Sequence, residues 1–189
     1  MDFSRAISAH PIIAAVRDLN HLADAIESPV RVVFLMTGEI LSVGDAIREL
    51  QKAGKCVVVH VDLIRGLSSD KEAVRFLART AAPDAVVSTK LQLLQATRKE
   101  GIAAVQQLFM IDTQAFHTSV RHVSEFRPDA IEIMPGLMPR VIADLASEVG
   151  IPIIAAGLIK SYSEVQSAID AGAVAAVVGD RTLWPLALE

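Results

Sequence analysis

The chain has 189 residues, of which 52% are hydrophobic, and it carries a formal net charge of −4 at pH 7. This length suffices for one domain with a large core. The negative charge argues against a uniformly basic nucleic-acid binder, although it leaves room for a local basic patch. Aromatic residues make up only 4%, which argues against a platform for stacking single-stranded bases.

Neither a membrane span nor a secretion signal is evident in the sequence. Glycines and charged residues interrupt every apolar run before it reaches about 18 residues. The first apolar stretch follows no basic segment and is too short for a signal peptide. We therefore expect a cytoplasmic protein. The single Cys56 lies in an apolar run, where we expect a small core residue.

Eight short apolar runs recur along the chain. They cover residues 11–16, 31–38, 55–62, 84–89, 103–112, 129–136, 151–157 and 173–179. Most are nearly continuous, which is typical of strands buried on both faces of a parallel sheet. Segments with helical spacing separate them, and two helices are expected to begin with capping boxes, Ser69 with Glu72 and Ser161 with Glu164.

This order of strands and helices predicts one α/β domain, residues 1–189, folded as a compact (β/α)8 barrel of the TIM type. The chain allows about 24 residues per unit, fewer than in the usual barrel of ~250 residues. The loops must therefore be short and the last helix abbreviated. A doubly wound open sheet is the structural alternative.

The ends of the last two strands carry the clearest signal of a site. Phosphate commonly binds in barrels after strands 7 and 8, on backbone N–H groups that glycine leaves accessible. Gly157 ends the seventh run and Gly179 the eighth. We therefore predict phosphate binding at Gly157, Leu158, Gly179 and Asp180. The alternative is that each glycine only makes a turn.

Other ligand-binding candidates follow the earlier strands, namely Arg17, His60, Asp62, Lys90 and Glu132. His60 and Asp62 are two residues apart and share a face, where they could bind hydroxyls or transfer protons. A core histidine and a loop-capping aspartate are the alternatives. Lys90 could form a Schiff base, pair with an anion or be solvated. Glu132 lies in an apolar strand and needs a partner, for which Lys90 or Arg17 would serve.

Motifs of common catalytic and cofactor sites are absent from the sequence. It contains no G-x-x-x-x-G-K-[ST] loop, no G-x-G-x-x-G and no Cys/His spacing of a zinc site. We expect neither a metal nor a cofactor. The enzyme hypothesis that stays open is a small phosphate-binding lyase or isomerase that uses Lys90, Asp62 and Glu132.

Several short motifs occur in a fixed order along nearly the whole chain. The most specific are H-V-D-L-I-R-G-L at 60–67, S-T-K at 88–90 and E-I-M-P-G at 132–136. Together they resemble the glycerol-3-phosphate-responsive antiterminators, which regulate glycerol uptake operons. The resemblance implies a barrel without enzymatic turnover, which senses glycerol 3-phosphate and acts on leader mRNA so that transcription continues past a terminator.

The chain departs from this family pattern at two places. It has Val178-Gly179-Asp180 where serine or threonine is usual, and Gln106-Gln107 where a glutamine–arginine pair is expected. An aspartate at a phosphate site must turn away or face a cation, which Arg181 could supply.

The sequence leaves the RNA-binding surface open. No Arg/Lys-rich run, RRM signature or KH loop occurs. The candidate basic residues lie on expected helices, where a solvated face is the alternative; they are Arg98, Lys99, Arg121, His122 and Arg140. A homodimer would double such a patch.

Overall fold

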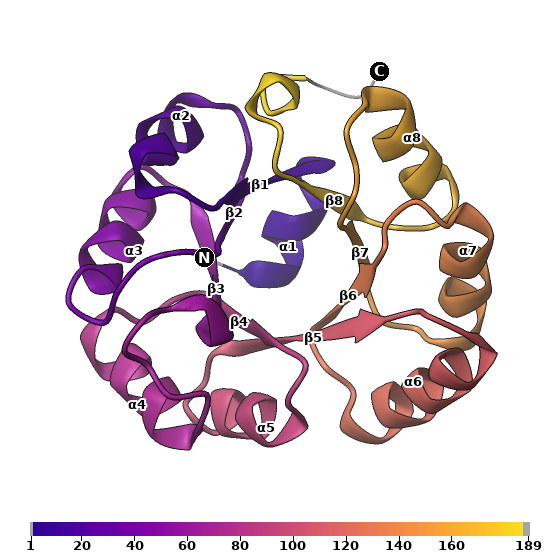
Figure 1. Ribbon diagram of the computed structural model, residues 1–189, viewed down its shortest axis with the longest axis horizontal. Helices are drawn as coiled ribbons and strands as arrows, with labels where there is room; N and C mark the ends of the chain where they lie inside the picture. The colour runs from indigo at the N-terminus through magenta and orange to yellow at the C-terminus, as the bar shows by residue number, and fades with distance from the viewer. Residues whose placement is uncertain (1, 187–189) are drawn as a thin grey trace.

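Eight parallel strands close into a barrel in chain order, with β1 paired to β8 (Figure 1). The computed structural model describes residues 2–186, so the ends of the predicted domain, residue 1 and residues 187–189, lie outside the described residues. The strands are β1 Ile12–Val16, β2 Val32–Leu35, β3 Cys56–His60, β4 Ala85–Ser88, β5 Ala103–Phe109, β6 Ala130–Met134, β7 Ile153–Ala156 and β8 Ala175–Val178. The predicted barrel is confirmed. The open sheet is wrong, because the first and last strands pair, with Ile13 opposite Val177.

Helices surround this barrel on the outside (Figure 1). They are α2 Leu22–Glu27, α3 Val43–Lys52, α4 Lys71–Thr80, α5 Leu91–Lys99, α6 Thr113–Phe126, α7 Pro139–Glu148 and α8 Tyr162–Asp170. Short 3-10 helices follow three strands, η1 Leu19–His21, η2 Val61–Leu63 and η3 Arg181–Leu183. In the described chain η3 is the only helix after β8, as the short length per unit predicts. No described helix is long and apolar enough to span a membrane.

Of the two predicted capping boxes, the structure shows one, at α8. At α8 the box is confirmed, because Ser161 Oγ accepts from the Glu164 amide and the Glu164 carboxylate accepts from the Ser161 amide. At α4 the predicted box is wrong. Asp70 caps that helix instead, accepting from the amides two and three residues on.

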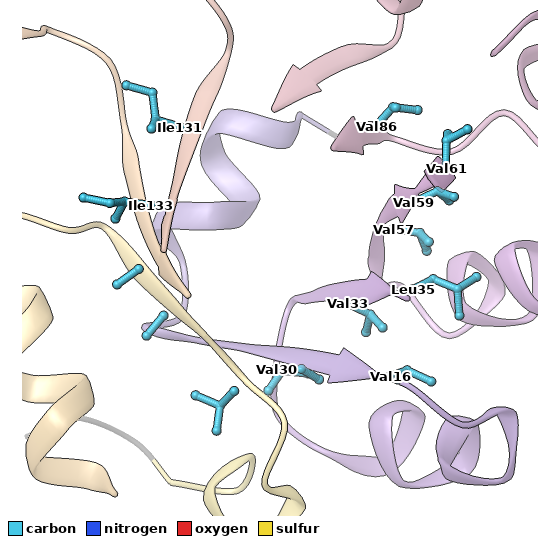
Figure 2. Packing of buried hydrophobic residues seen from close by; sticks show 14 of the residues in the cluster. Val16, Val30, Val33, Leu35, Val57, Val59, Val61, Val86, Ile131 and Ile133 are labelled. Carbon is cyan, nitrogen blue, oxygen red and sulfur yellow. The ribbon is translucent and has the colours of Figure 1, made fainter. Parts of the chain in front are cut away.

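Alternate strand residues divide the core into two layers. Outward-facing side chains such as Val33, Val59 and Ile131 pack beneath the helices, and Figure 2 shows part of this layer. Inward-facing side chains such as Phe34 and Cys56 fill the barrel. Burial raises the pKa of the Cys56 thiol to about 12, consistent with a core residue.

The helix α1, Phe3–Ser8, closes the end of the barrel where the strands begin. Its Phe3, Ala6 and Ile7 join the inward-facing cluster, and the helix lies across the barrel in Figure 1. Because α1 covers the amino ends of the strands, the opposite mouth, at their carboxyl ends, is the open one.

The closure by α1 can be tested with Ile7→Ala. Ile7 has no exposed surface, so its truncation should lower the free energy of unfolding by about 2–5 kcal/mol in urea denaturation. Ile111→Ala is the matched control, because Ile111 is 81% exposed and its truncation should change stability by less than about 0.5 kcal/mol. Equal effects of the two substitutions would contradict the packing of α1 in the barrel.

Candidate ligand site at the barrel mouth

A cavity of about 420 Å³ lies between α6 and α7, but a larger one, of about 920 Å³, lies over the carboxyl ends of β1 and β5 to β8. Arg17, Phe109, Met134, Pro135, Gly157, Leu158, Ile159, Lys160, Val177, Gly179 and Asp180 line the larger cavity. It brings together five of the predicted site residues, Arg17 and the four predicted to bind phosphate. Because it spans the ends of β7 and β8, it lies where barrels commonly bind phosphate.

Backbone amides without partners lie on the wall of this cavity. Gly157 and Leu158 both have positive φ, 80° and 65°, so the chain turns sharply as β7 ends. Within residues 2–186, the amides of Leu158, Ile159, Gly179 and Asp180 donate no hydrogen bond. Such groups normally find an acceptor, and an anion supplies several acceptors at once.

The start of α8, in contrast, is satisfied by its own side chains. The Glu164 carboxylate accepts from the Lys160 amide at 2.7 Å and from the Ser161 amide at 3.0 Å. The Lys160 hydrogen bond is the main cause that lowers the pKa of Glu164. The amides left for a ligand are therefore those of the preceding turn.

Arg17 is the cation closest to the Gly179 end of the cavity wall. A Cβ placed on Gly179 would lie 3.8 Å from Arg17 Cζ, so the guanidinium packs directly against this glycine. Among the described residues Arg17 forms neither a hydrogen bond nor an ion pair. Its charge is thus available to an anion held by the neighbouring amides.

The carboxylate of Asp180, which follows β8, is engaged away from the cavity. Asp180 Oδ1 accepts from the Thr182 amide at 2.9 Å and from Thr182 Oγ1 at 2.7 Å. These bonds to Thr182 lower the pKa of Asp180. Arg181, expected as its cation, pairs instead with Asp24 on α2. Asp180 therefore contributes its backbone amide to the cavity, while its carboxylate caps η3.

Close packing fixes the turn after β6 against β7. A Cβ on Gly136 would lie 2.8 Å from Ile159 Cδ1 and 2.9 Å from the Ala156 nitrogen, so no larger residue fits. The Gly136 amide also donates to the Gly157 carbonyl at 3.2 Å. This contact explains the glycine in E-I-M-P-G, because it sets the position of the predicted phosphate turn.

The remaining predicted site residues lie outside the lining of this cavity. Asp62 accepts from Lys90 Nζ and from Ser88 Oγ, each at 2.8 Å. Burial raises the pKa of Asp62, but hydrogen bonds from Lys90, Ser69 and Ser88 outweigh it and hold the pKa below its usual range. This cluster holds the Lys90 ammonium group, whose side chain is 53% exposed, against the Asp62 carboxylate.

Glu132 has a partner that the sequence did not suggest. It is wholly buried, and Gln107 Nε2 donates to its Oε2 at 2.7 Å. The expected pairing with Lys90 or Arg17 is wrong, because Lys90 bonds to Asp62 and Arg17 packs on Gly179. Without an ion pair, burial raises the pKa of Glu132 to about 7.

His60 lies on the same inward face of the barrel. Burial lowers the pKa of His60. Two neighbours oppose this shift, namely Asp62 and Gln107, and Asp62 Oδ2 lies 4.0 Å from His60 Nδ1. The sequence analysis noted Gln107 and Met134 within motifs but did not assign either residue to the site. Alternation along β5 and β6 could have indicated them, because both residues share the inward face with Glu132.

The fold and the site thus define a (β/α)8 barrel with an anion-ready turn after β7 and β8. A family model described as "Glycerol-3-phosphate responsive antiterminator" matches residues 12–184. The chain belongs to this family of regulators, as the sequence motifs predicted.

Solved structures support this assignment. The glycerol uptake operon antiterminator regulatory protein of Listeria monocytogenes is 29% identical with a TM-score of 0.87, covering 92% of this chain and 94% of that chain. A glycerol uptake operon antiterminator-related protein of Thermotoga maritima is 28% identical with a TM-score of 0.83, covering 94% and 99%. YgcP of Escherichia coli K12 is 34% identical over 99% of this chain and 98% of its own length.

Enzymes of the same fold are more distant. Orotidine 5'-phosphate decarboxylase of Pyrococcus horikoshii is 20% identical with a TM-score of 0.68, covering 92% of this chain and 91% of that chain. At this identity the likeness concerns the fold alone.

The raised pKa of Glu132 predicts a pH-dependent stability. The unfolded carboxyl loses its proton near its usual pKa of 4.5, whereas the folded one keeps it to about pH 7. Between these values the unfolded state binds fewer protons, so the contribution of Glu132 to stability falls as the pH rises. From pH 5 to 7, the free energy of unfolding of wild type should fall relative to Glu132→Gln by up to about 1 kcal/mol per pH unit.

Urea denaturation across this pH range measures the difference. His60 titrates in both proteins, so its effect cancels. Glu125→Gln, at an exposed position on α6, is the control and should follow wild type. Parallel pH profiles of wild type and Glu132→Gln would contradict the burial of an ionisable Glu132.

Proposed function

We propose that the protein senses glycerol 3-phosphate, binds leader mRNA and promotes transcription antitermination of glycerol-utilisation genes, without enzymatic turnover. The observation that carries the proposal is the mouth cavity, where four unpaired amides and the Arg17 guanidinium meet. Membership of the antiterminator family supports the regulatory role. Such a protein works in the cytoplasm, where transcripts are made.

The ligand would bind with its phosphate at the β7 and β8 turns. Leu158, Ile159, Gly179 and Asp180 would present backbone amides around the turn that Gly157 makes, and Arg17 would supply the opposite charge. The glycerol end would point toward the polar side chains of the other strands, which are His60, Asp62, Lys90 and Glu132. No metal or cofactor is part of this proposal.

The surroundings of Lys90 support sensing over catalysis. A Schiff-base lysine must be neutral, which requires desolvation or a neighbouring cation. Lys90 is half exposed and forms an ion pair with Asp62 at 2.8 Å, so its ammonium group is neither desolvated nor next to a cation in this ion pair. The proposal therefore excludes a lyase or isomerase reaction that starts at Lys90.

The basic residues proposed to contact RNA fall into two groups. Some of their side chains bind neighbouring groups of the protein, and others have no hydrogen bond or ion pair among the described residues. Arg98 donates to the Phe126 carbonyl at 2.9 Å and stacks on the Phe126 ring, and Arg140 pairs with Asp144 at 2.9 Å. Lys99, Arg121 and His122 are exposed on α5 and α6. We assign these three side chains to the RNA surface, which a homodimer would double.

The phosphate site can be tested by thermal unfolding with glycerol 3-phosphate. A ligand at 100 times its Kd adds about 2.7 kcal/mol of stability. Gly179→Ala places a methyl group 3.8 Å from Arg17 Cζ, at the wall of the predicted phosphate site. It should weaken binding at least tenfold and so remove about 1.4 kcal/mol of that gain.

Gly150→Ala is the matched control, because nothing lies within 4 Å of its added Cβ. It should keep the full ligand-induced shift. Equal shifts in the two variants would place the phosphate elsewhere, and no shift in wild type would refute glycerol 3-phosphate as the ligand.

RNA binding should depend on the ligand. In gel-shift assays, wild type should bind the leader transcript of a glycerol uptake operon more tightly with glycerol 3-phosphate than without it. Replacement of Lys99 and Arg121 by Gln should weaken binding and reduce its salt dependence, because fewer phosphates are neutralised. Replacement of Arg48 and Arg75, which are paired with Asp45 and Glu72, should have little effect. Absence of binding in both ligand states would refute the RNA function.

A further inference from the structure

Two buried polar atoms inside the barrel lack partners although neighbouring groups are paired. Within the described residues, His60 Nδ1 and Glu132 Oε1 form no hydrogen bond. Both residues lie on the inward face, with His60 7% and Glu132 0% exposed. Gln107, 6% exposed, lies between them and donates to the other Glu132 oxygen. Since unpaired buried polar atoms are rare and costly, they point to a missing partner.

Met134 separates these atoms from the mouth cavity. It follows Glu132 by two residues on the inward face of β6 and lines the cavity. Its Sδ lies 3.7 Å from Gln107 Nε2, and its Cγ would lie 3.6 Å from a Cβ on Gly157. The Met134 thioether thus touches both the phosphate turn and the buried amide. Methionine is unbranched and turns easily, and its sulfur is a weak acceptor that a hydroxyl can replace.

We propose that Gln107 and Glu132 form an inner subsite for the hydroxyl groups of a phosphorylated polyol, uncovered when Met134 turns aside, and that Glu132 receives them as a neutral acid. This inference rests on the proposed function for the ligand. It adds a second, proton-dependent half to the phosphate site at Gly157 and Gly179.

The surroundings of Glu132 favour the neutral acid. On the inward face, β5 presents the uncharged Gln107 and β7 presents Ile154 and Ala156. Among the residues that the structure describes, no cation pairs with the carboxyl group of Glu132. The ionisable side chains of other elements at this end of the barrel include His60, the last residue of β3, Asp62, which follows it, and Arg17 after β1, which packs on Gly179. Burial outweighs the hydrogen bond from Gln107 and raises the pKa of Glu132 to about 7, and an anion bound above it would raise the pKa further.

A neutral acid also fits hydroxyl groups better than a carboxylate. It offers an O–H donor and a carbonyl acceptor, as a hydroxyl does, whereas a carboxylate only accepts. The inner subsite would therefore distinguish a polyol phosphate from inorganic phosphate, which needs only the outer amides and Arg17.

The test is isothermal titration calorimetry with glycerol 3-phosphate and with inorganic phosphate at pH 6 and pH 8. With a pKa of about 7, the neutral fraction of Glu132 falls about tenfold across this range, and the apparent affinity of wild type for glycerol 3-phosphate should fall with it. Glu132→Gln stays neutral, so its affinity for glycerol 3-phosphate should change between pH 6 and pH 8 only as much as titration of the ligand itself requires. Inorganic phosphate should behave alike in both proteins.

Met134→Ile provides a second variant, in case Glu132→Gln does not fold. A β-branched side chain turns less freely, so this variant should bind glycerol 3-phosphate at least tenfold more weakly and inorganic phosphate normally. Circular dichroism and thermal unfolding check that each variant is folded.

The outcomes separate the two proposals. If wild type binds glycerol 3-phosphate with the same pH dependence as Glu132→Gln, the inner subsite is overturned while the phosphate site stands. If wild type binds inorganic phosphate but glycerol 3-phosphate no more tightly, the inner subsite is again overturned. If neither compound binds, both the proposed function and the inner subsite fail.

Discussion

Pairing of β1 with β8 is the constraint on which the rest of the structure depends. Once these strands meet, all eight carboxyl ends lie around one mouth, and every second side chain must point into the barrel. The other end is closed by α1, whose apolar side chains complete the interior. Groups far apart in sequence, such as Arg17 and Gly179, therefore become neighbours at the only open end of the described barrel.

The mouth combines two kinds of electrostatic environment. At the β7 and β8 turns, backbone amides and the Arg17 guanidinium line the cavity and have no hydrogen-bond partner among residues 2–186, an arrangement that favours an anion without further reorganisation. One layer deeper, Glu132 is buried without a charged partner, and the low dielectric there favours its neutral form. The proposed sensing of a polyol phosphate uses this contrast, since phosphate suits the first environment and hydroxyl groups the second.

In the proposed function, the polar side chains of this barrel serve recognition rather than bond breaking. Lys90, the obvious nucleophile, is held by Asp62 and partly solvated, and Asp62 is in turn satisfied by Ser88. Within residues 2–186, the side-chain partner of Glu132 is the uncharged Gln107 and not a lysine. A ligand switches a regulator only when it binds two conformations of the protein with different affinities. In the proposal, Met134 can couple ligand binding to such a change, because it contacts both halves of the site.

The sequence by itself determined the eight strands, the helices between them and the glycines that end the last two strands. These features depend on local periodicity and on turn chemistry, which short segments encode. Only the tertiary structure decided the partners of the charged groups. Spacing along the chain suggested Lys90 or Arg17 for Glu132, yet the pairing followed from strand order in the closed barrel, which places Gln107 of β5 directly beside Glu132 of β6. Side-chain pairing depends on such distances in space, and one sequence does not contain them.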